Sequence, residues 1–455
     1  MLVFLFWEVN QDRTKNLSEI MGLSNIIFLI LLIGSIALFV INLRRIIKNI
    51  KLGRDIERSD RTFDRWKNMF RVALGQSKMT RRPVAGLLHI IVYIGFIIIN
   101  IEMIEIIVDG VFGTHRFLSS VLHIRLYNFL IASFEILALL VLVSCTIFLI
   151  RRNILKIKRF WNKEMKKWPR TDANLILVFE ILLMSAFLLM NASDMLIQNR
   201  VGFIQIGAFP ISQFLVPIID ELSLESLYFL ERFNWWFHII GVLAFMNYVL
   251  ISKHLHIFFA FPSTYYANLK PLGGFNNLDS VTKEVKLMMD PNAEPYAASS
   301  EDTSPTEVFG AKDVTDLNWV QLLNAYSCTE CGRCTSNCPA NQTGKLLSPR
   351  KILMDTRDRI TEFSYNKRKG LEDTKSLLGD YISAEELWAC TSCNACTDSC
   401  PIELDPLSII IDMRRYLVME ESAAPAELNM MFTNMENNGA PWQFPAMDRL
   451  KWKDE

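Results

Sequence analysis

Long apolar stretches dominate the first 260 residues of the chain. Five of them are long enough to cross a bilayer as a helix, which takes about 20 predominantly apolar residues. They lie at residues 26–43, 84–108, 122–150, 173–190 and 235–259. The first stretch is not typical of a cleaved signal peptide, because it starts too far from the N-terminus and is not followed by a cleavage site of small residues. This pattern predicts an all-α membrane protein in which residues 1–260 form a five-helix transmembrane bundle.

The pattern changes after residue 260. Residues 261–312 begin with several Pro and Gly positions and continue into a polar run at 295–305, which is typical of a linker that becomes ordered against a partner. Residues 313–420 combine helical apolar spacing, including Leu407 to Met419, with two cysteine-rich stretches. We expect a helical domain there and, at 421–455, a C-terminal tail that binds a partner.

Basic residues are distributed unevenly between the predicted spans. Residues 44–82 carry thirteen Lys or Arg and residues 151–170 carry nine, whereas residues 109–121 carry one and residues 195–233 carry two. Because basic loops stay in the cytoplasm, we expect a multi-pass protein of the cytoplasmic (inner) membrane with its N-terminus outside and residues 313–455 in the cytoplasm. Attraction to anionic lipid headgroups accounts for these loops, so they do not require nucleic acid as a partner.

Two copies of one cysteine spacing carry the chemistry of the second half. The run CxxCxxCxxxCP begins at Cys328 and again at Cys390. This spacing binds a [4Fe-4S] cluster through three thiolates of one copy and the fourth thiolate of the other copy. It predicts one cluster on Cys328, Cys331, Cys334 and Cys400, and a second on Cys390, Cys393, Cys396 and Cys338. The helical domain is therefore expected to be a cytoplasmic two-cluster ferredoxin module.

Structural zinc is the alternative for these cysteines, because CxxC pairs also form tetrahedral zinc sites. Zinc, however, needs four ligands per ion and has no requirement for the whole run repeated twice. The ninth cysteine, Cys145, lies in an apolar stretch and is expected to serve packing. Thiolate clusters need a reducing compartment, which agrees with the cytoplasmic placement that the basic loops predict.

Histidines in the predicted spans indicate haem. His238 and His256 are 18 residues apart. In one continuous helix this is five turns, so both side chains share a face and lie about 27 Å apart, as two stacked haems require. By depth, His89 at the start of the second span pairs with His256 on the inner side. His123 at the start of the third span pairs with His238 on the outer side.

The alternative for any single histidine is a polar residue at a helix end, satisfied by water or a headgroup. Four histidines paired by depth and face favour at least one haem b, since ionisable groups inside a membrane are usually functional. His115, in the outer loop, is the substitute if His123 is not a ligand. His254 lies two residues from His256 and therefore on another helix face.

The chain resembles two known groups of membrane proteins. Five spans with histidines 18 residues apart on the last one resemble the cytochrome b (gamma) subunit of respiratory nitrate reductase. The run CTECGRCTSNCPA at 328–340, with residues 343–349, 386–401 and 413–418, resembles the iron-sulfur region of membrane-bound heterodisulfide-reductase-like oxidoreductases. Members of that family include enzymes that oxidise electron-transfer flavoprotein for quinone.

This resemblance implies a cytochrome b domain and a two-cluster module, combined with a further domain that carries CCG motifs. No CCG occurs in this chain, so we expect that domain on a separate subunit. The fourth span carries no histidine, and the second carries one where the nitrate reductase helix carries two. The resemblance therefore implies an inner haem b, and the number of haems, one or two, stays open.

Sequence motifs also exclude several activities. There is no GxGxxG after a strand, no P-loop and no Ser-His-Asp set, so flavin, nicotinamide and nucleotide hydrolysis have no site in this chain. We expect a membrane-bound subunit of a respiratory oxidoreductase that passes electrons between a cytoplasmic donor such as electron-transfer flavoprotein, the two clusters, haem b and the quinone pool. One alternative is a quinol-oxidising subunit that feeds a heterodisulfide or sulfur-compound reductase. Another is a non-catalytic anchor or redox sensor with structural clusters.

Polar residues near the outer end of the second span are candidates for a quinone site. Asn100, Glu102 and Glu105 lie there, and Arg125 opens the third span. Their depth and polarity suit the binding or protonation of a quinone. Bridges to haem propionates, or to one another, are the alternative role for these groups.

Overall fold

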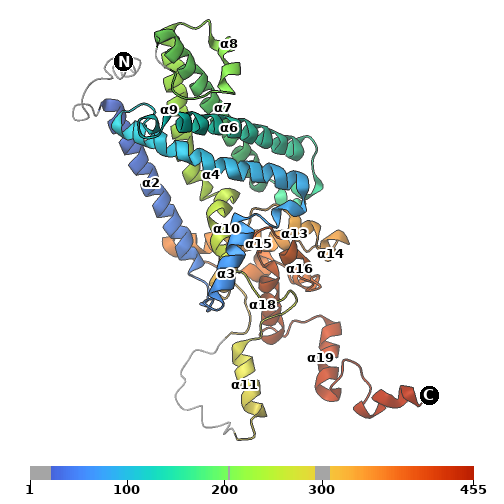
Figure 1. Cartoon of the computed structure of the whole chain (residues 1–455). Helices are drawn as coiled ribbons and strands as arrows, with labels where there is room; N and C mark the ends of the chain where they lie inside the picture. The colour runs from blue at the N-terminus through green and yellow to red at the C-terminus, as the bar shows by residue number, and fades with distance from the viewer. Residues whose placement is uncertain (1–21, 203–204, 293–307, 455) are drawn as a thin grey trace.

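The computed structural model describes residues 22–202, 205–292 and 308–454 (Figure 1). Almost all regular structure in these ranges is helical, and β-structure is limited to the isolated bridges Arg54–Asn318 and Leu378–Ile382. The predicted all-α fold is therefore confirmed for this part of the chain.

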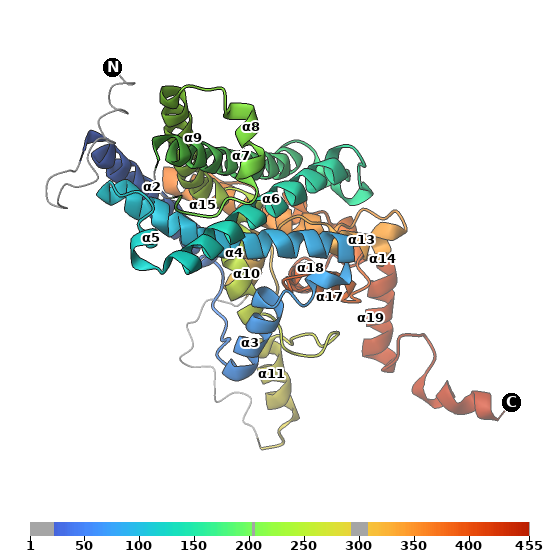
Figure 2. The ribbon, with the colours of Figure 1, turned by 45° about the horizontal axis from the view of Figure 1, so that its top comes forward.

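Four of the described helices are long and apolar enough to cross a membrane. Three of them contain the predicted stretches 26–43, 84–108 and 173–190, and the fourth begins two residues after the start of 122–150. At about 1.5 Å per residue, each is longer than the hydrocarbon core of a bilayer, which is about 30 Å thick. In Figure 2, α4 lies beside α6, α6 beside α7 and α7 beside α9, and α2 packs on α4 and α9. The helices are α2 (Leu23–Ile50), α4 (Pro83–Phe112), α6 (Ile124–Asn153), α7 (Trp168–Val201) and the less apolar α9 (Leu224–Val249).

The fifth predicted span is not one continuous helix, so the prediction of a straight helix over 235–259 is wrong. After α9 ends, the short helix η7 (Lys253–Leu255) and α10 (His256–Tyr265) continue at 87° to it. Ser252 is extended between them, and its Oγ accepts the N–H of His254 at 3.1 Å. A side chain that bonds its own backbone in this way starts a new helix and interrupts the old one.

Short helices surround the cysteine motifs in the second half of the chain. The first of them, α12, starts at a capping box in which Asn318 and Gln321 each bond the other's backbone. The helix predicted over 407–419 is confirmed as α18 (Pro406–Met419). The first helix, α12, covers Trp319–Ser327. The others are α13 (Arg333–Ser336), α14 (Pro339–Gln342), α15 (Pro349–Lys369), η8 (Leu377–Tyr381), α16 (Ala384–Trp388) and α17 (Ala395–Ser399).

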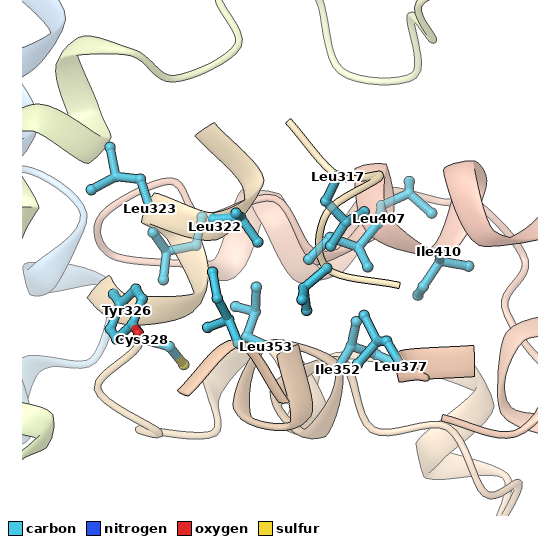
Figure 3. Close-up of a cluster of buried hydrophobic side chains, with 14 of the residues drawn as sticks. Leu317, Leu322, Leu323, Tyr326, Cys328, Ile352, Leu353, Leu377, Leu407 and Ile410 are labelled. Atoms are coloured by element: carbon cyan, nitrogen blue, oxygen red, sulfur yellow. The ribbon is translucent and has the colours of Figure 1, made fainter. Parts of the chain in front are cut away.

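An apolar core holds α12, α15 and α18 together (Figure 3). Cys328 belongs to this core, so the first cysteine loop starts from a fixed base. The other labelled side chains of this core are Leu317, Leu322, Leu323, Tyr326, Ile352, Leu353, Leu377, Leu407 and Ile410.

Both basic loops lie against the iron-sulfur domain. Arg81, in the loop before α4, pairs with Asp398 at 2.9 Å. Glu164, in the loop before α7, pairs with the fully buried Arg350 at 2.7 Å. The basic loops and the cysteine motifs therefore lie at the same end of the helical bundle. We call this the proximal end and the opposite one the distal end.

The predicted linker and tail contain helices. α10 extends into the linker 261–312 as far as Tyr265, and α11 (Asp279–Met289) follows, whereas the polar run 295–305 lies outside the described residues. Within the tail 421–455, α19 (Ala426–Asn438) and η9 (Ala446–Lys453) project from the domain (Figure 1). Large apolar side chains are exposed along this tail, among them Met430, Met435, Phe444 and Trp452.

A buried arginine ties the domain together. Arg359 is 1% exposed and donates to Asp313 at 2.6 Å and Asp373 at 3.0 Å. We expect Arg359→Leu to lower the unfolding free energy by about 3 kcal/mol, because it leaves two carboxylates without their cation. Lys375→Ala breaks an exposed pair with Glu362 and should cost less than about 1 kcal/mol. Urea unfolding of the detergent-solubilised chain measures the unfolding free energy of both variants. Equal losses in the two variants would contradict the structural role of the buried Arg359 ion pairs.

Candidate functional site

The first cysteine loop opens on a cavity at the edge of the domain core. Its apolar walls are formed by Leu353 of α15, Ile402 and Pro406, the first residue of α18. Cys396 also borders it. The remaining thiols that line it are those of Cys328, Cys331, Cys334 and Cys400. This is the set that the sequence predicts for one cluster, and its fourth member comes from the second copy of the motif.

The other four predicted ligands form a second group. Cys338 and Cys393 are close enough for their charges to interact, and Cys390 interacts with both. Cys396 in turn interacts with Cys390. Cys393 is exposed, whereas Cys338 and Cys396 are buried. The second group therefore reaches the protein surface.

The chemistry of these thiols fits iron-sulfur clusters. Burial raises the pKa of Cys328 to about 11 and the pKa values of Cys396 and Cys400 to about 12. Thiolates in these positions need positive charge beside them, which the iron ions of a cluster supply.

Within the described ranges, no three His, Cys, Asp or Glu side chains are grouped closely enough to bind a single metal ion.

Two predicted haem ligands meet at the proximal end of the bundle. The ring centres of His89 on α4 and His256 at the start of α10 are 6.3 Å apart. Two imidazoles on opposite sides of one iron have this spacing, since the metal–nitrogen bond is about 2 Å and the ring centre lies about 1.1 Å beyond it. His256 donates its Nδ1–H to the Lys253 carbonyl at 3.1 Å, which leaves Nε2 free for a metal. Nδ1 of His89 is buried without a hydrogen-bond partner.

The bend after α9 changes the interpretation of two other histidines. His238 and His256 do not share one face of one helix, so the prediction based on their 18-residue spacing is wrong. The pairing of His89 with His256 rests on depth alone. His254, which the sequence places on another helix face, lies beside this pair, with its ring 5.4 Å from that of His256.

His238 lies apart from the other histidines. It is buried on α9 and donates its Nδ1–H to the Leu183 carbonyl at 3.0 Å. Its aromatic neighbour is Phe187, with ring centres 5.9 Å apart, and no second histidine ring is in contact with it in the described part of the chain. A bis-histidine site at this position is therefore incomplete.

The predicted outer partners of His238 face elsewhere. His123 is exposed at the N-terminus of α6, where its Nδ1 accepts the N–H of Arg125 at 3.3 Å. The substitute, His115, lies 3.4 Å from Asp194. The structure thus brings the inner pair of predicted ligands together and not the outer pair.

A polar pocket opens at the distal end of the bundle, between α2, α4, α7, α9 and the loop after α4. Of the four predicted quinone residues, Glu102 and Glu105 line this pocket. Asn100 is exposed and donates to the Phe96 carbonyl, and Arg125 is exposed at the start of α6. Two of the four therefore lie together.

The sequence did not single out the basic and aromatic groups of this distal pocket. Arg116 is buried there and donates to Asp194 at 2.9 Å. Phe28 and Trp235, with ring centres 5.7 Å apart, line an aromatic wall. Glu102 is 3% exposed, and its Oε2 has no hydrogen-bond partner. The one sequence signal for this distal pocket is the presence of acidic residues inside apolar spans.

Comparison with known proteins supports the iron-sulfur assignment. A family model described as a 4Fe-4S dicluster domain matches residues 327–404. The chain is 29% identical over 467 residues to the probable iron-sulfur-binding oxidoreductase FadF of Bacillus subtilis, covering 94% of this chain and 61% of the relative. It is 27% identical over 431 residues to the EtfAB:quinone oxidoreductase of Syntrophomonas wolfei, covering 88% and 55%.

A third relative matches the cysteine region. The chain is 32% identical over 116 residues to a subunit of the ferredoxin/F(420)H(2)-dependent CoB-CoM heterodisulfide reductase of Methanosarcina acetivorans, covering 25% of this chain and 60% of the relative. The chain thus spans 55–61% of the two curated relatives that cover most of it. No solved structure matches.

These relatives confirm the predicted resemblance to heterodisulfide-reductase-like and EtfAB:quinone-type iron-sulfur oxidoreductases. The relatives are named as oxidoreductases or as subunits of an oxidoreductase, and the matching family model identifies residues 327–404 as a 4Fe-4S dicluster domain. The resemblance of the helical bundle to the nitrate reductase cytochrome b subunit stays a prediction.

Proposed function

We propose that this chain is the membrane electron-transfer subunit of a respiratory oxidoreductase and passes electrons between a cytoplasmic donor, two [4Fe-4S] clusters, one haem b and the quinone pool. The observation that carries the proposal is the 6.3 Å spacing of the His89 and His256 rings beside the domain that holds the cysteine cavity. Likeness to an EtfAB:quinone oxidoreductase supports quinone as one end of the route.

The cysteine loops hold the clusters by crossed ligation in this proposal. One set is Cys328, Cys331, Cys334 and Cys400, and the other is Cys390, Cys393, Cys396 and Cys338. When bound, such clusters supply reversible one-electron chemistry. Around the first set, Leu353, Ile402 and Pro406 exclude water. The exposed Cys393 leaves the second set accessible to a soluble partner.

His89 and His256 would hold the haem iron through their imidazole nitrogens. The Lys253 carbonyl fixes the tautomer and ring orientation of His256. A second haem has less support, since His238 lacks a partner ring and His123 is exposed. We therefore assign one haem, at the proximal end of the bundle.

The distal pocket is the proposed quinone site. Phe28 and Trp235 offer ring faces against which a quinone ring can lie, and Glu102 presents an unpaired carboxyl oxygen. Reduction of a quinone to its quinol takes two electrons and two protons. In the proposal Glu102 delivers one of these protons to a quinone oxygen, is protonated again from the solvent at the pocket mouth and delivers the second, while Glu105, which accepts the Leu118 N–H at 2.9 Å, stays in place beside it.

Replacing Glu102 tests the quinone site. Glu102→Gln should lower the rate of quinone reduction on the order of 100-fold, because an amide cannot deliver the proton that a carboxylic acid delivers. Asn100→Ala, two residues away on the exposed face of α4, should leave the rate unchanged. Steady-state reduction of a menaquinone analogue measures both variants. An unchanged rate in Glu102→Gln would remove this residue from the reaction.

The partners and the orientation are also part of the proposal. The basic proximal loops support an orientation in which the cysteine domain lies in the cytoplasm and the distal pocket lies near the outer surface. A CCG-domain protein, as a separate subunit, is the proposed partner that links electron-transfer flavoprotein to the second cluster. Exposed Met430, Met435 and Phe444 on the projecting tail are its proposed contact surface.

Likeness to a heterodisulfide reductase subunit favours one second candidate, in which quinol electrons pass outward to a disulfide reductase. The intact membrane complex distinguishes the two directions. Reduced electron-transfer flavoprotein should reduce a quinone through the purified complex, with a CCG-domain protein among the co-purifying subunits. Turnover only from quinol to a disulfide would support the second candidate and overturn the first.

A further inference from the structure

The two cysteine loops have the same backbone geometry and differ in one side chain. The residue after Cys328-Thr329 is Glu330, and the residue after Cys390-Thr391 is Ser392. Both have left-handed backbones, with φ of 56° and 55°. Both donate their N–H to the Sγ two residues earlier at 3.4 Å. Serine therefore satisfies the turn, and the carboxylate of Glu330 has another role.

That carboxylate lies across the interface between the two domains. Glu330 is 3% exposed and contacts Lys253 at 2.5 Å and Arg357 at 2.8 Å. Arg357 belongs to α15 in the iron-sulfur domain, whereas Lys253 lies in the break between α9 and α10. Burial of a carboxylate is unfavourable unless cations compensate it. The two cations therefore hold the first cysteine loop against the helix break.

Lys253 leads directly to the proposed haem ligand. Its carbonyl accepts the Nδ1–H of His256 at 3.1 Å, and its backbone N–H donates to Asp172 of α7 at 3.0 Å. A short chain of contacts thus runs from Cys328 through Glu330 and Lys253 to His256.

Among the described residues, Ser392 of the second loop makes no corresponding contact with the bundle, and this motif meets the membrane half instead at Asp398, which pairs with Arg81 at 2.9 Å. Ser392 Oγ accepts from Arg414 of α18 at 3.2 Å, within its own domain. The neighbouring Cys393 is exposed. The two loops therefore face different surroundings, the first the helix break and the second the surface.

We propose that Glu330 is a positioning residue that makes the first iron-sulfur centre, and not the second, exchange electrons with the haem. This rests on the proposed function. Transfer of one electron along the route oxidises the first centre by one electron and reduces the haem iron by one, with no bond made or broken. The second centre, at Cys393, is the one that exchanges electrons with the soluble partner.

Two substitutions test this role in the purified complex of the full-length chain with its proposed CCG-domain partner. Glu330→Gln removes the charge, and Glu330→Ser copies the second loop, so the turn and the cluster should be retained. Rapid mixing with photoreduced electron-transfer flavoprotein should show haem reduction slowed at least about tenfold in both, since displacements of about 1 Å have such effects. Glu421→Gln, in an exposed pair with Lys312, is the matched control and should reduce at the wild-type rate.

A double mutant shows whether Glu330 acts through Lys253. Lys253→Met should slow haem reduction as Glu330→Gln does, and the combination should be no slower than either single variant, because interacting residues are not additive. Additive slowing would overturn the proposal. So would a wild-type rate in Glu330→Gln, or loss of the first cluster in Glu330→Ser, which would make the residue part of cluster assembly.

A readout without haem separates this inference from the proposed function. Amide hydrogen exchange at residues 250–257 should rise in Glu330→Gln and stay at the wild-type level in Glu421→Gln. If the wild-type protein contains no haem, the proposed function fails, and the exchange experiment still decides whether Glu330 holds the loop on the helix break. Unchanged exchange in Glu330→Gln would overturn that contact.

Discussion

Changing Cys400 to serine should remove the cluster that the first motif holds, although Cys400 belongs to the second. It lines one cavity with Cys328, Cys331 and Cys334, and it supplies the fourth ligand in the crossed arrangement. The wild-type chain, reconstituted anaerobically, should hold about eight irons and eight labile sulfides, and the variant about half. Iron and sulfide analysis with electron paramagnetic resonance of the reduced protein measures the loss.

The control for this experiment is Cys145→Ser. Cys145 is buried in α6 and lies in the apolar core of the bundle, so its substitution should leave both cluster signals intact. If Cys400→Ser instead removed only the signal of the second motif, crossed ligation would be wrong and each motif would hold its own cluster.

Substitution of either proximal histidine by alanine should abolish haem binding. Reduced-minus-oxidised spectra of the wild type should show b-type bands, because two imidazoles keep the iron six-coordinate. His89→Ala or His256→Ala should lose these bands, since one ligand of the pair whose rings lie 6.3 Å apart is gone. The chain should then no longer pass electrons from the clusters to quinone.

Two exposed or partly exposed histidines serve as controls. His123→Ala and His115→Ala should retain the full b-type bands, because neither ring contacts His89 or His256. Loss of haem in His123→Ala with normal spectra in His256→Ala would contradict the assignment and restore the outer site that the sequence predicts.

The sequence predicts the spans and the cysteine chemistry for physical reasons that are local. A bilayer imposes a minimum apolar length on a helix, and four of the predicted spans depend on nothing else. Cluster ligation imposes short spacings between cysteines, so the eight ligands can be named from their order along the chain. The confirmed helix α18 has a regular apolar spacing of its own.

The break after α9 could not be predicted in the same way. No proline lies in 235–259, and the one glycine, Gly241, is inside α9. The break depends on tertiary contacts, since the Lys253 N–H bonds Asp172 on α7 and the Lys253 amine bonds Glu330 in the other domain. Helical periodicity predicts which side chains share a face only where the helix continues, so the predicted shared face of His238 and His256 was wrong. The pairing of His89 with His256 by their depth in the membrane does not require a continuous helix.

The distal pocket shows a further limit of sequence reasoning. Its lining comes from α2, α4, α7, α9 and the loop after α4, which are far apart in the chain. Glu102 and Glu105 could be singled out because carboxylates are rare in apolar spans. Asn100 and Arg125 lie at a similar depth, but they are exposed and do not line the pocket. Depth alone does not specify which side of a helix faces the interior of the bundle.

Reoxidation by quinone tests the central claim most directly. The purified full-length chain, reduced anaerobically, is mixed rapidly with a menaquinone analogue while haem and cluster absorbance are followed together. We predict that the haem is reoxidised first and that both clusters are then reoxidised through it, with two electrons consumed per quinone. Clusters that stay reduced after the haem is oxidised, or that are reoxidised at the same rate in a haem-free His256→Ala chain, would contradict the account.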